Sequence, residues 1–438
     1  MARQTCTIGV DLGTTNAKAA AFDAQGHAIE GAAAETAIPR LLGGAEQDPH
    51  AVYAAATAVL AQAAGGATGR GYVVERLGLS AAMHSLVLVA SDETPLANAL
   101  TWMDTRAGAE ARALWATPAG RELYARTGTP VAAMSPLVKL LWLRATQPQL
   151  FAQARKFVSL KEWVWFQWFG EWCIDASMAS ATGLYNLRLG NWDVEALALA
   201  NITPERLSRL VLTTYTRAGL REPALRAAGI APEAQVTIGA SDGVLANLGV
   251  GALDSRTLAL TIGTSLAVRM GTTAPVTDPV TGLFCYVLDA GHFVAGGPSN
   301  SGGLVLDWLY HQVLGSDASP DDHDGFARML AAASQARTGR LLCLPYVDGE
   351  RAPLWQANAR AVLFGLGLEH TAAAVLRATI EGMLFNAHWI ASGLFERLGR
   401  PSEIAATGKV LESGWIRQLT ADIFGLPVRF LGAVDASL

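Results

Sequence analysis

The stretch Ile8–Asp23, with the sequence IGVDLGTTNAKAAAFD, decides the fold of this chain. An apolar run over residues 5–10 stops at Asp11 and Gly13, and a second run of short side chains continues to Phe22. This pattern predicts a strand, a tight turn and a returning strand. An ordinary hairpin, in which the aspartate and the threonines only satisfy the turn, would have the same pattern.

The turn carries the side chains of a phosphate site. Gly13 allows the backbone to approach a ligand closely, and the hydroxyls of Thr14 and Thr15, with the N–H groups of the turn, can hold phosphate oxygens. Asp11, at the end of the strand, can position a hydrated Mg²⁺. We therefore predict phosphate binding at Thr14 and Thr15 and a magnesium position at Asp11.

The same pattern returns half a chain later. Residues 258–270, LALTIGTSLAVRM, again place an apolar run before a turn and a second apolar run. Gly263, Thr264 and Ser265 match the triplet at residues 13–15 at one offset, and an alanine follows two residues on in both. This repeat predicts two homologous domains whose turns bind one phosphate chain.

Length and composition agree with two domains. A chain of 438 residues is too long for one ordinary core, and we place the domains at 1–250 and 251–438. The composition, 51% hydrophobic and 16% charged, is typical of a globular protein with large buried interfaces. The formal net charge of -5 argues against nucleic-acid binding.

Cysteine spacing and the N-terminus indicate the compartment. The 4 cysteines are far apart and lack CxxC spacing, which argues against a disulfide framework or a zinc site. A strand begins close to the N-terminus without an apolar leader, and no run approaches the roughly 18 apolar residues of a membrane helix. We expect a cytoplasmic protein with no membrane partner.

Local signals define the next elements. Residues 27–33 predict a third strand. Asp48 as a cap and Pro49 at the first helical position predict a helix to about Ala64, ended by the glycine-rich GGATGRG. Residues 72–80 form an apolar run suited to a buried strand.

Two motifs of the first domain lie at strand ends. Met83 and His84 follow a buried strand, and Asp104 and Arg106 stand at alternating positions in LTWMDTR, residues 100–106. Strand ends are where ligands of α/β sheets collect, so we take both motifs as candidate substrate contacts. A structural core histidine and an Asp–Arg salt bridge are the alternatives.

Residues 108–170 have a helical pattern in which tryptophans alternate with lysines. In an acidic chain this mixture indicates core packing with lysine ammonium groups that reach solvent, rather than stacking on nucleic acid. Residues 175–187 are small and polar before they turn apolar, and we expect a loop beside a cleft there.

A strand within residues 236–251 ends at Asp242, followed by Gly243 and a short helix of small residues. A turn or cap aspartate fits the same pattern. Placed at the domain junction, the carboxylate can instead take a proton from a substrate hydroxyl, which makes Asp242 the candidate general base.

In the second domain, residues 296–308 place a glycine-rich turn that includes Gly303 before a helix start, a suitable place for nucleotide phosphates. Residues 371–398 predict a long amphipathic helix, and residues 415–424 predict a shorter helix that ends at Gly425.

Taken together, these motifs closely resemble those of the FGGY carbohydrate kinases over essentially the whole chain. The resemblance rests on the order and spacing of DLGTTNAK at 11–18, QDP at 47–49, MHS at 83–85, TWMDTR at 101–106, GASDG at 239–243, GTS at 263–265 and LPYVDGERAP at 344–353. It implies an α/β fold of two ribonuclease-H-like domains of the actin-like ATPase type, with a cleft between them.

Within the family, KFVSLKEW at 156–163 and SMASATGLYNL at 177–187 are similar to strings of the gluconate kinase subgroup. Xylulose kinases usually carry a glycine where Ser85 stands. The resemblance therefore implies transfer of the γ-phosphoryl group of ATP to D-gluconate, giving 6-phosphogluconate. A xylulose kinase, or another pentulose or polyol kinase of the family, is the alternative.

The resemblance also implies roles for the site residues. Asp242 acts as general base, with positioning as its larger task in a loose transition state. The sugar contacts Met83, His84, Asp104, Arg106 and Asp242. ATP binds through Thr14, Thr15, Lys18, Gly263, Thr264, Gly303 and Gly408, and Mg²⁺ is held through water by Asp11. A substrate carboxylate needs a cationic partner, for which Arg106, Lys139 and Lys161 are the candidates.

Two departures from the family pattern concern the second domain. The adenosine-side motif of the family normally has two glycines and a serine before its tryptophan, whereas residues 407–415 are TGKVLESGW. The chain ends at Leu438, where the family continues into a closing helix, so we expect a shortened second domain. We also expect the domains to close on binding and exclude water, and dimers are common among similar enzymes.

Two readings from other classes remain open. A chaperone-like or filament-forming ATPase would share both phosphate turns but lack the MHS and TWMDTR strings. A non-catalytic sugar-binding protein would keep the pocket and lose the base, whereas Asp242 is present here.

Overall fold

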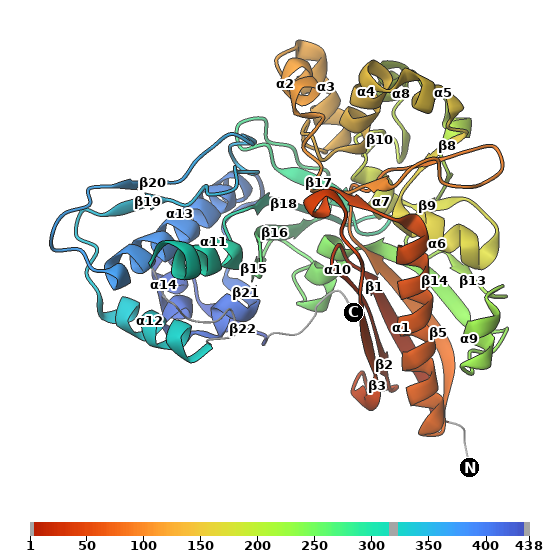
Figure 1. Cartoon of the computed structure of the whole chain (residues 1–438), viewed down its shortest axis with the longest axis horizontal. Coiled ribbons are helices and arrows are strands. Elements are labelled where there is room, and N and C mark those ends of the chain that lie inside the picture. The colour runs from red at the N-terminus through yellow and green to blue at the C-terminus, as the bar shows by residue number, and fades with distance from the viewer. Residues whose placement is uncertain (1–3, 315–322, 433–438) are drawn as a thin grey trace. The chain divides into compact units, whose positions relative to one another are not determined.

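The structure is a computed structural model that describes residues 4–314 and 323–432 (Figure 1). These residues form two compact units. The first comprises residues 4–249 together with Cys285–Phe293, and the second comprises residues 250–284 together with 294–432. Both units combine strands with helices, so the fold class is α/β, as the sequence predicts. The expected shortening at Leu438 lies outside the described residues.

The first unit is built on a mixed six-stranded sheet with the order β13-β14-β5-β1-β2-β3. β1 and β2 are antiparallel, as are β2 and β3, whereas β5 is parallel to β1 and β14 is parallel to β5. The predicted strand–turn–strand and the third strand are confirmed. The strands are β1 (Gln4–Leu12), β2 (Asn16–Phe22), β3 (Ala28–Ala37), β5 (Tyr72–Ala81), β13 (Thr216–Arg217) and β14 (Gln235–Ser241).

Helix α1 (Pro49–Gly69) packs against β1, β2 and β3 (Figure 1). Asp48 caps it as predicted, because its side chain accepts a hydrogen bond of 2.9 Å from the backbone N–H two residues on. The predicted end at Ala64 is wrong. A Cβ on Gly66 would lie 2.3 Å from the carbonyl oxygen of Gly31, so this glycine permits close packing on β3 rather than a turn.

The first unit also contains a mostly helical region over residues 108–200 and several short strands. The remaining elements are β4 (Glu46–Gln47), β6 (Val87–Val89), β7 (Ala99–Leu100), α2 (Gly108–Trp115), α3 (Pro118–Thr127), α4 (Pro136–Thr146), α5 (Pro148–Gln153), β8 (Lys156–Val158), α6 (Leu160–Phe169), β9 (Cys173–Asp175), α7 (Ala176–Ser180), β10 (Tyr185–Asn186), β11 (Asn191–Trp192), α8 (Val194–Ala200), β12 (Arg209–Val211), α9 (Pro223–Ala227) and α10 (Asp242–Gly249).

Helices α4 and α6 confirm one part of the prediction for the tryptophan–lysine segment and contradict another. Trp163, Trp165 and Trp168 are at most 2% exposed and belong to the core, as expected. The lysines do not reach solvent: Lys139 and Lys161 are each 1% exposed. Their ammonium groups are satisfied inside the protein by hydrogen bonds, which sequence periodicity does not reveal.

Residues 175–187 are not the loop that the sequence predicts. They contain α7 and β10 and are almost entirely buried. Asp175 explains the helix, because its carboxylate accepts a hydrogen bond of 2.9 Å from the Met178 N–H and thus acts as the N-cap.

The second unit repeats the strand arrangement of the first. β15 is antiparallel to β16 and parallel to β21, and β22 is parallel to β21. The β15–β16 hairpin therefore corresponds to β1–β2, β21 to β5, and β22 to β14. The strands are β15 (Thr257–Ile262), β16 (Leu266–Thr272), β18 (Phe293–Ser299), β21 (Glu403–Thr407) and β22 (Val428–Phe430).

Two predicted helices of the second unit are confirmed. α13 (Ala372–Leu398) packs against β16 and is capped by Thr371, and α14 (Gly414–Phe424) ends at Gly425, whose φ of 60° is left-handed. The remaining elements of the second unit are α11 (Gly303–Trp308), α12 (His323–Gln335), β19 (Leu342–Leu344) and β20 (Val362–Phe364), whereas β17 (Phe284–Val287) belongs from Cys285 onward to the first unit. Within residues 4–314 and 323–432, no helix is long and apolar enough to cross a lipid bilayer.

Candidate active site

The carboxyl ends of β1, β5 and β14 bring polar groups together at one edge of the first sheet. Asp11 on β1 is opposite Ser80 on β5, and Ser80 is opposite Ala240 on β14. The Ser80 hydroxyl donates a hydrogen bond of 2.6 Å to the buried Asp11 carboxylate. Parallel strands collect ligand-binding residues at this edge, and Asp242 follows β14 here, as the sequence predicts.

Asp242 is the first residue of α10 and is half-buried. Its Oδ1 accepts a hydrogen bond of 2.6 Å from the Gly243 N–H. The backbone just before it is irregular: Gly239 has a φ of 68°, and a Cβ there would lie 2.0 Å from the Leu79 carbonyl oxygen. Glycine is thus required where β14 approaches β5 and delivers the carboxylate.

The first hairpin turn, residues 13–15, is held from several sides. The Gly13 N–H donates to the Asn16 carbonyl at 3.0 Å, and a Cβ on Gly13 would lie 2.9 Å from the same oxygen. The Thr14 carbonyl accepts a hydrogen bond of 2.9 Å from the Gln47 amide, and the Thr14 hydroxyl accepts one of 2.7 Å from the Trp102 indole. Both donors therefore fix the predicted phosphate turn.

Trp102 and Gln47 support the first hairpin turn through Thr14, although neither is assigned a role from the sequence. Each lies in a quoted string, TWMDTR or QDP, and that is the signal that could have found them. Thr15 is exposed, and its carbonyl accepts a hydrogen bond of 2.7 Å from the Ile38 N–H.

Lys18 lies on β2 directly opposite Asp11, on the same face of the hairpin. Its ammonium nitrogen is 4.0 Å from a carboxylate oxygen of Glu35 on β3. The predicted cation is therefore near the predicted magnesium ligand, and it also has an acidic neighbour.

The MHS motif forms a tight, buried turn. His84 has a φ of 65°, a conformation that is rare for histidine, and is 7% exposed. Its Nδ1 lies 2.8 Å from the Ala181 carbonyl, and its Nε2 lies 3.4 Å from the Tyr286 hydroxyl. Met83 is half-buried and lines a small pocket together with Thr14 and Trp102. The structure thus brings Met83 next to the first hairpin turn.

Asp104 and Arg106 form an ion pair, which was the structural alternative for this motif. The Arg106 Nε lies 3.1 and 3.0 Å from the two carboxylate oxygens of Asp104, and Nη2 donates to Glu46 at 2.8 Å. The Arg106 guanidinium also lies 4.9 Å from the ring centre of Trp142. Asp104 is 2% exposed, whereas the Arg106 side chain is 37% exposed, so the cation is the accessible member of the pair.

The buried side chain of Lys139 connects the MHS and TWMDTR motifs. Its ammonium donates to the carbonyl of His84 at 2.6 Å and to the carbonyl of Thr101 at 2.7 Å. Burial lowers the pKa of Lys139 to about 7, and the nearby charge of Asp104 opposes this shift. The side chain therefore fixes the backbone of both motifs.

Lys161 likewise supports the backbone, at the carboxyl end of β14. Its ammonium lies 2.8 Å from an Asp175 carboxylate oxygen and donates to the Ala240 carbonyl at 2.9 Å. Burial lowers the pKa of Lys161, while Asp175 opposes the shift. Lys161 thus anchors the end of β14 two residues before Asp242.

The second hairpin turn, residues 263–265, is covered by backbone rather than by side chains. The Gly303 N–H donates to the Gly263 carbonyl at 2.7 Å, and the Leu304 N–H donates to the Thr264 carbonyl at 3.1 Å. Gly408, at the end of the neighbouring strand β21, has a φ of 104°, and a Cβ there would lie 2.3 Å from the Ile262 carbonyl oxygen. The predicted nucleotide residues of the second unit therefore lie together.

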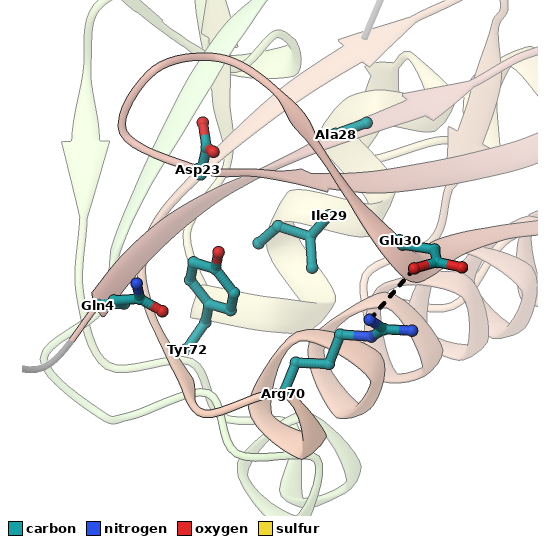
Figure 2. A pocket seen from close by; sticks show the side chains of 7 residues that line it. All are labelled: Gln4, Asp23, Ala28, Ile29, Glu30, Arg70 and Tyr72. Carbon is teal, nitrogen blue, oxygen red and sulfur yellow. Dashed lines mark hydrogen bonds and ion pairs between the residues drawn. The ribbon is translucent and has the colours of Figure 1, made fainter.

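A wide, open pocket of about 480 Å³ lies elsewhere on the first unit, and Figure 2 shows its lining residues. Gln4 begins β1, so the pocket is at the opposite end of that strand, roughly 23 Å from Asp11 at 3.3 Å per residue. Its ion pair, Arg70–Glu30 at 3.4 Å, is exposed. We therefore locate the candidate site at the turn end of the sheet and not in this pocket. The lining residues are Gln4, Asp23, Ala28, Ile29, Glu30, Arg70 and Tyr72.

Among residues 4–314 and 323–432, no group of three or more His, Cys, Asp or Glu side chains is placed to hold a metal ion. A single carboxylate such as Asp11 is compatible with Mg²⁺, because this ion keeps most of its waters and is often held by one carboxylate and the phosphates of a nucleotide.

Comparisons with known proteins identify both units. A model described as the N-terminal domain of the FGGY family of carbohydrate kinases matches residues 6–249, and the model of the C-terminal domain matches residues 258–438. The gluconokinase of Bacillus subtilis is 37% identical over 428 residues, which cover 95% of this chain and 82% of that protein.

Two solved structures from Lactobacillus acidophilus are similar to this chain. One, titled gluconate kinase, has a TM-score of 0.91 at 33% identity and covers 99% of this chain and 87% of that chain. The other, titled ligand-bound xylulose kinase, has a TM-score of 0.91 at 34% identity, with coverage of 99% and 87%.

Proposed function

Because the chain belongs to the FGGY family of carbohydrate kinases, we propose that it transfers the γ-phosphoryl group of ATP to D-gluconate, releasing ADP and 6-phosphogluconate. The chain is a carbohydrate kinase, and ATP is the phosphoryl donor that this family implies. The observation that carries the choice of gluconate is the 37% identity to the gluconokinase of Bacillus subtilis over 95% of this chain.

In this proposal Asp242 receives the proton of the attacking hydroxyl. The hydroxyl oxygen forms a bond to the γ-phosphorus, the bond from that phosphorus to the leaving ADP oxygen breaks, and the hydroxyl proton passes to the Asp242 carboxylate. A carboxylate is a weak base for an alcohol, but the proton moves late in a loose transition state, so Asp242 acts mainly by orienting the hydroxyl. Its fixed position at the start of α10 supports this role.

Mg²⁺ would be held through water by Asp11 and would supply positive charge to the phosphates. Thr14, Thr15 and Lys18 are proposed to contact phosphate oxygens in the first unit. Gly263, Thr264, Gly303 and Gly408 are proposed to contact the nucleotide in the second unit, where a Cβ on Gly263 would have no heavy atom within 4 Å.

Met83, His84, Asp104 and Arg106 are proposed to form the sugar site. Among the three cations considered for the gluconate carboxylate, Arg106 is supported best, because Lys139 and Lys161 are each 1% exposed whereas the Arg106 side chain is 37% exposed. We expect Arg106→Ala to raise KM for gluconate more than KM for a neutral sugar; equal effects on both would contradict this assignment.

Xylulose is the second candidate acceptor, because the structure titled xylulose kinase is 34% identical to this chain. A coupled assay of ADP release separates the candidates when gluconate, xylulose, ribulose, glycerol and no sugar are compared at equal concentrations. We expect the highest kcat/KM with gluconate. A higher value with xylulose would transfer the assignment to that sugar, and ADP release that no sugar stimulates would refute the kinase proposal.

A further inference from the structure

Glu350 is a buried carboxylate that the proposed function does not use. It lies in LPYVDGERAP, residues 344–353, and is 2% exposed. Burial raises the pKa of Glu350, while hydrogen bonds from its neighbours oppose the shift. A charge in such a place is costly unless hydrogen bonds compensate for lost water.

Both oxygens of the Glu350 carboxylate are surrounded by donors. Oε1 accepts hydrogen bonds from the N–H groups of Asn300, at 2.8 Å, and Arg351, at 2.7 Å. Oε2 accepts from the hydroxyls of Ser299 and Ser301, both at 2.8 Å. The amide of Asn386 on α13 donates to the same oxygen at 3.2 Å. This donor set stabilises the ionised form.

Three of these donors are consecutive, residues 299–301, where β18 ends and the chain turns toward α11. Arg351 adds two hydrogen bonds to the same segment: its Nε donates to Asn300 Oδ1 at 2.7 Å, and its Nη2 donates to the Ser299 carbonyl at 3.0 Å. Glu350 and Arg351 together therefore fix the conformation of this turn.

The next two residues contact the second hairpin turn directly. The Gly303 N–H donates to the Gly263 carbonyl at 2.7 Å. A Cβ on Gly302 would lie 2.5 Å from the carbonyl carbon of Ser265, so the two backbones touch. Because this contact has little spare room, we expect a displacement of residues 299–301 to shift the hairpin turn as well.

We propose that Glu350 is a positioning residue for the second hairpin turn and thereby sets the affinity for the phosphate chain of the nucleotide. The inference rests on the proposed function, since it takes ATP as the ligand of that turn. Glu350 acts through residues 299–303 and does not itself contact the nucleotide.

Glu350→Gln tests this inference, because the amide keeps the shape of the side chain and removes the charge. We expect KM for ATP to rise about 10-fold and KM for gluconate to stay within about twofold, as expected when one charge-assisted contact network is weakened. Isothermal titration should show the same loss, about 10-fold, for ADP and less than about twofold for adenosine, which has no phosphate chain.

Two further variants separate positioning from loss of stability. Ser301→Ala removes one donor and keeps the carboxylate, and it should raise KM for ATP by about threefold without loss of the fold. Asp278→Asn is the matched control, since Asp278 is also a buried carboxylate of the second unit, 2% exposed, and accepts hydrogen bonds from Thr281 and Arg397 instead. It should lower Tm and leave KM for ATP unchanged.

The results distinguish this inference from the proposed function. Equal ADP affinity in wild type and Glu350→Gln overturns the role of Glu350, and so does an equal loss for ADP and adenosine. Absence of sugar-dependent ADP release in the wild type overturns the kinase proposal instead, and the ADP titration still decides the role of Glu350.

Discussion

The β1–β2 hairpin and the β15–β16 hairpin share one strand arrangement but differ in chemistry at matching positions. Asp11 on β1 accepts a hydrogen bond of 2.6 Å from Ser80 on the adjacent parallel strand. The corresponding pair on β15 and β21 is Thr261 and Thr407, whose hydroxyl oxygens are 3.0 Å apart. The repeat thus preserves the strand arrangement, while the carboxylate that can serve a metal ion stands only in the first of these two pairs.

The two turns also differ in their support. Leu12 pairs with Ala17 across the first turn, whereas Ile262 pairs with Leu266 across the second, which is one residue shorter. Side chains from distant motifs fix the first turn, and backbone N–H groups at the start of α11 hold the second. The first turn therefore depends on particular side chains, and the second depends on the absence of side chains.

Asp242→Asn should have the largest effect, because Asp242 is the carboxylate of the first unit that we propose as general base. We expect kcat to fall about 10³-fold, since the amide cannot accept the hydroxyl proton or orient the hydroxyl equally well. Affinity for ADP, measured by calorimetry, should stay within about twofold, because the nucleotide residues of the second unit are unchanged. A fall in kcat of less than about tenfold would remove Asp242 from the chemical step.

Asp11→Asn and Thr261→Val compare the matching positions directly. Asparagine keeps an acceptor for Ser80 but removes the charge, so we expect kcat/KM for ATP to fall about 100-fold and the Mg²⁺ concentration for half-maximal rate to rise about 10-fold. Thr261→Val should change both by less than about threefold. Equal losses in the two variants would show that the hairpins share the metal-linked role.

The sequence predicts the elements whose signals are local. Local conformation is set by the cap at Asp48, by the glycine at 425 and by the two turn triplets. The predictions of α1, α14 and both hairpins are therefore confirmed. The end of α1 is predicted too early because Gly66 packs against β3, a contact between residues far apart in the sequence. A glycine that allows close packing and one that ends a helix look alike in sequence.

The supports of the site are less visible in sequence because they connect residues far apart in the chain. The Trp102–Thr14 hydrogen bond spans 88 residues, and the Lys139–His84 hydrogen bond spans 55. Composition indicates that lysines near tryptophans reach solvent, yet here their ammonium groups meet backbone carbonyls inside the unit. Only the folded arrangement shows which cations remain accessible.

Lys139→Met tests how far the first unit depends on the buried amine of Lys139, which bonds to the carbonyls of His84 and Thr101. The pKa of Lys139 is lowered from 10.5 to about 7, with the charge of Asp104 raising it and that of Arg106 lowering it further. Between these values the unfolded chain holds a proton that the folded chain has released, so the free energy of unfolding rises with pH. From about pH 6.5 to 8.5 this contribution is about 2 kcal/mol in the wild type and absent in the variant.

Urea unfolding at several pH values measures this difference between wild type and Lys139→Met. Lys409→Met is the control, since Lys409 is exposed and its removal should leave the pH dependence of the wild type in place. A wild-type advantage that does not change between these pH values would mean that Lys139 keeps its proton throughout.

The smallest expected effect comes from alanine substitutions of the two turn glycines, Gly13 and Gly263. A Cβ on Gly263 would have no heavy atom within 4 Å, whereas a Cβ on Gly13 would lie 2.9 Å from the Asn16 carbonyl oxygen. Gly263→Ala should therefore leave Tm unchanged and raise KM for ATP about 10-fold, because its only penalty is to block the approach of phosphate to the backbone. Gly13→Ala should lower Tm by several degrees, because the turn itself must shift. If Gly263→Ala alters neither Tm nor KM for ATP, phosphate does not approach the second turn at this residue, and the correspondence between the two turns is one of backbone alone.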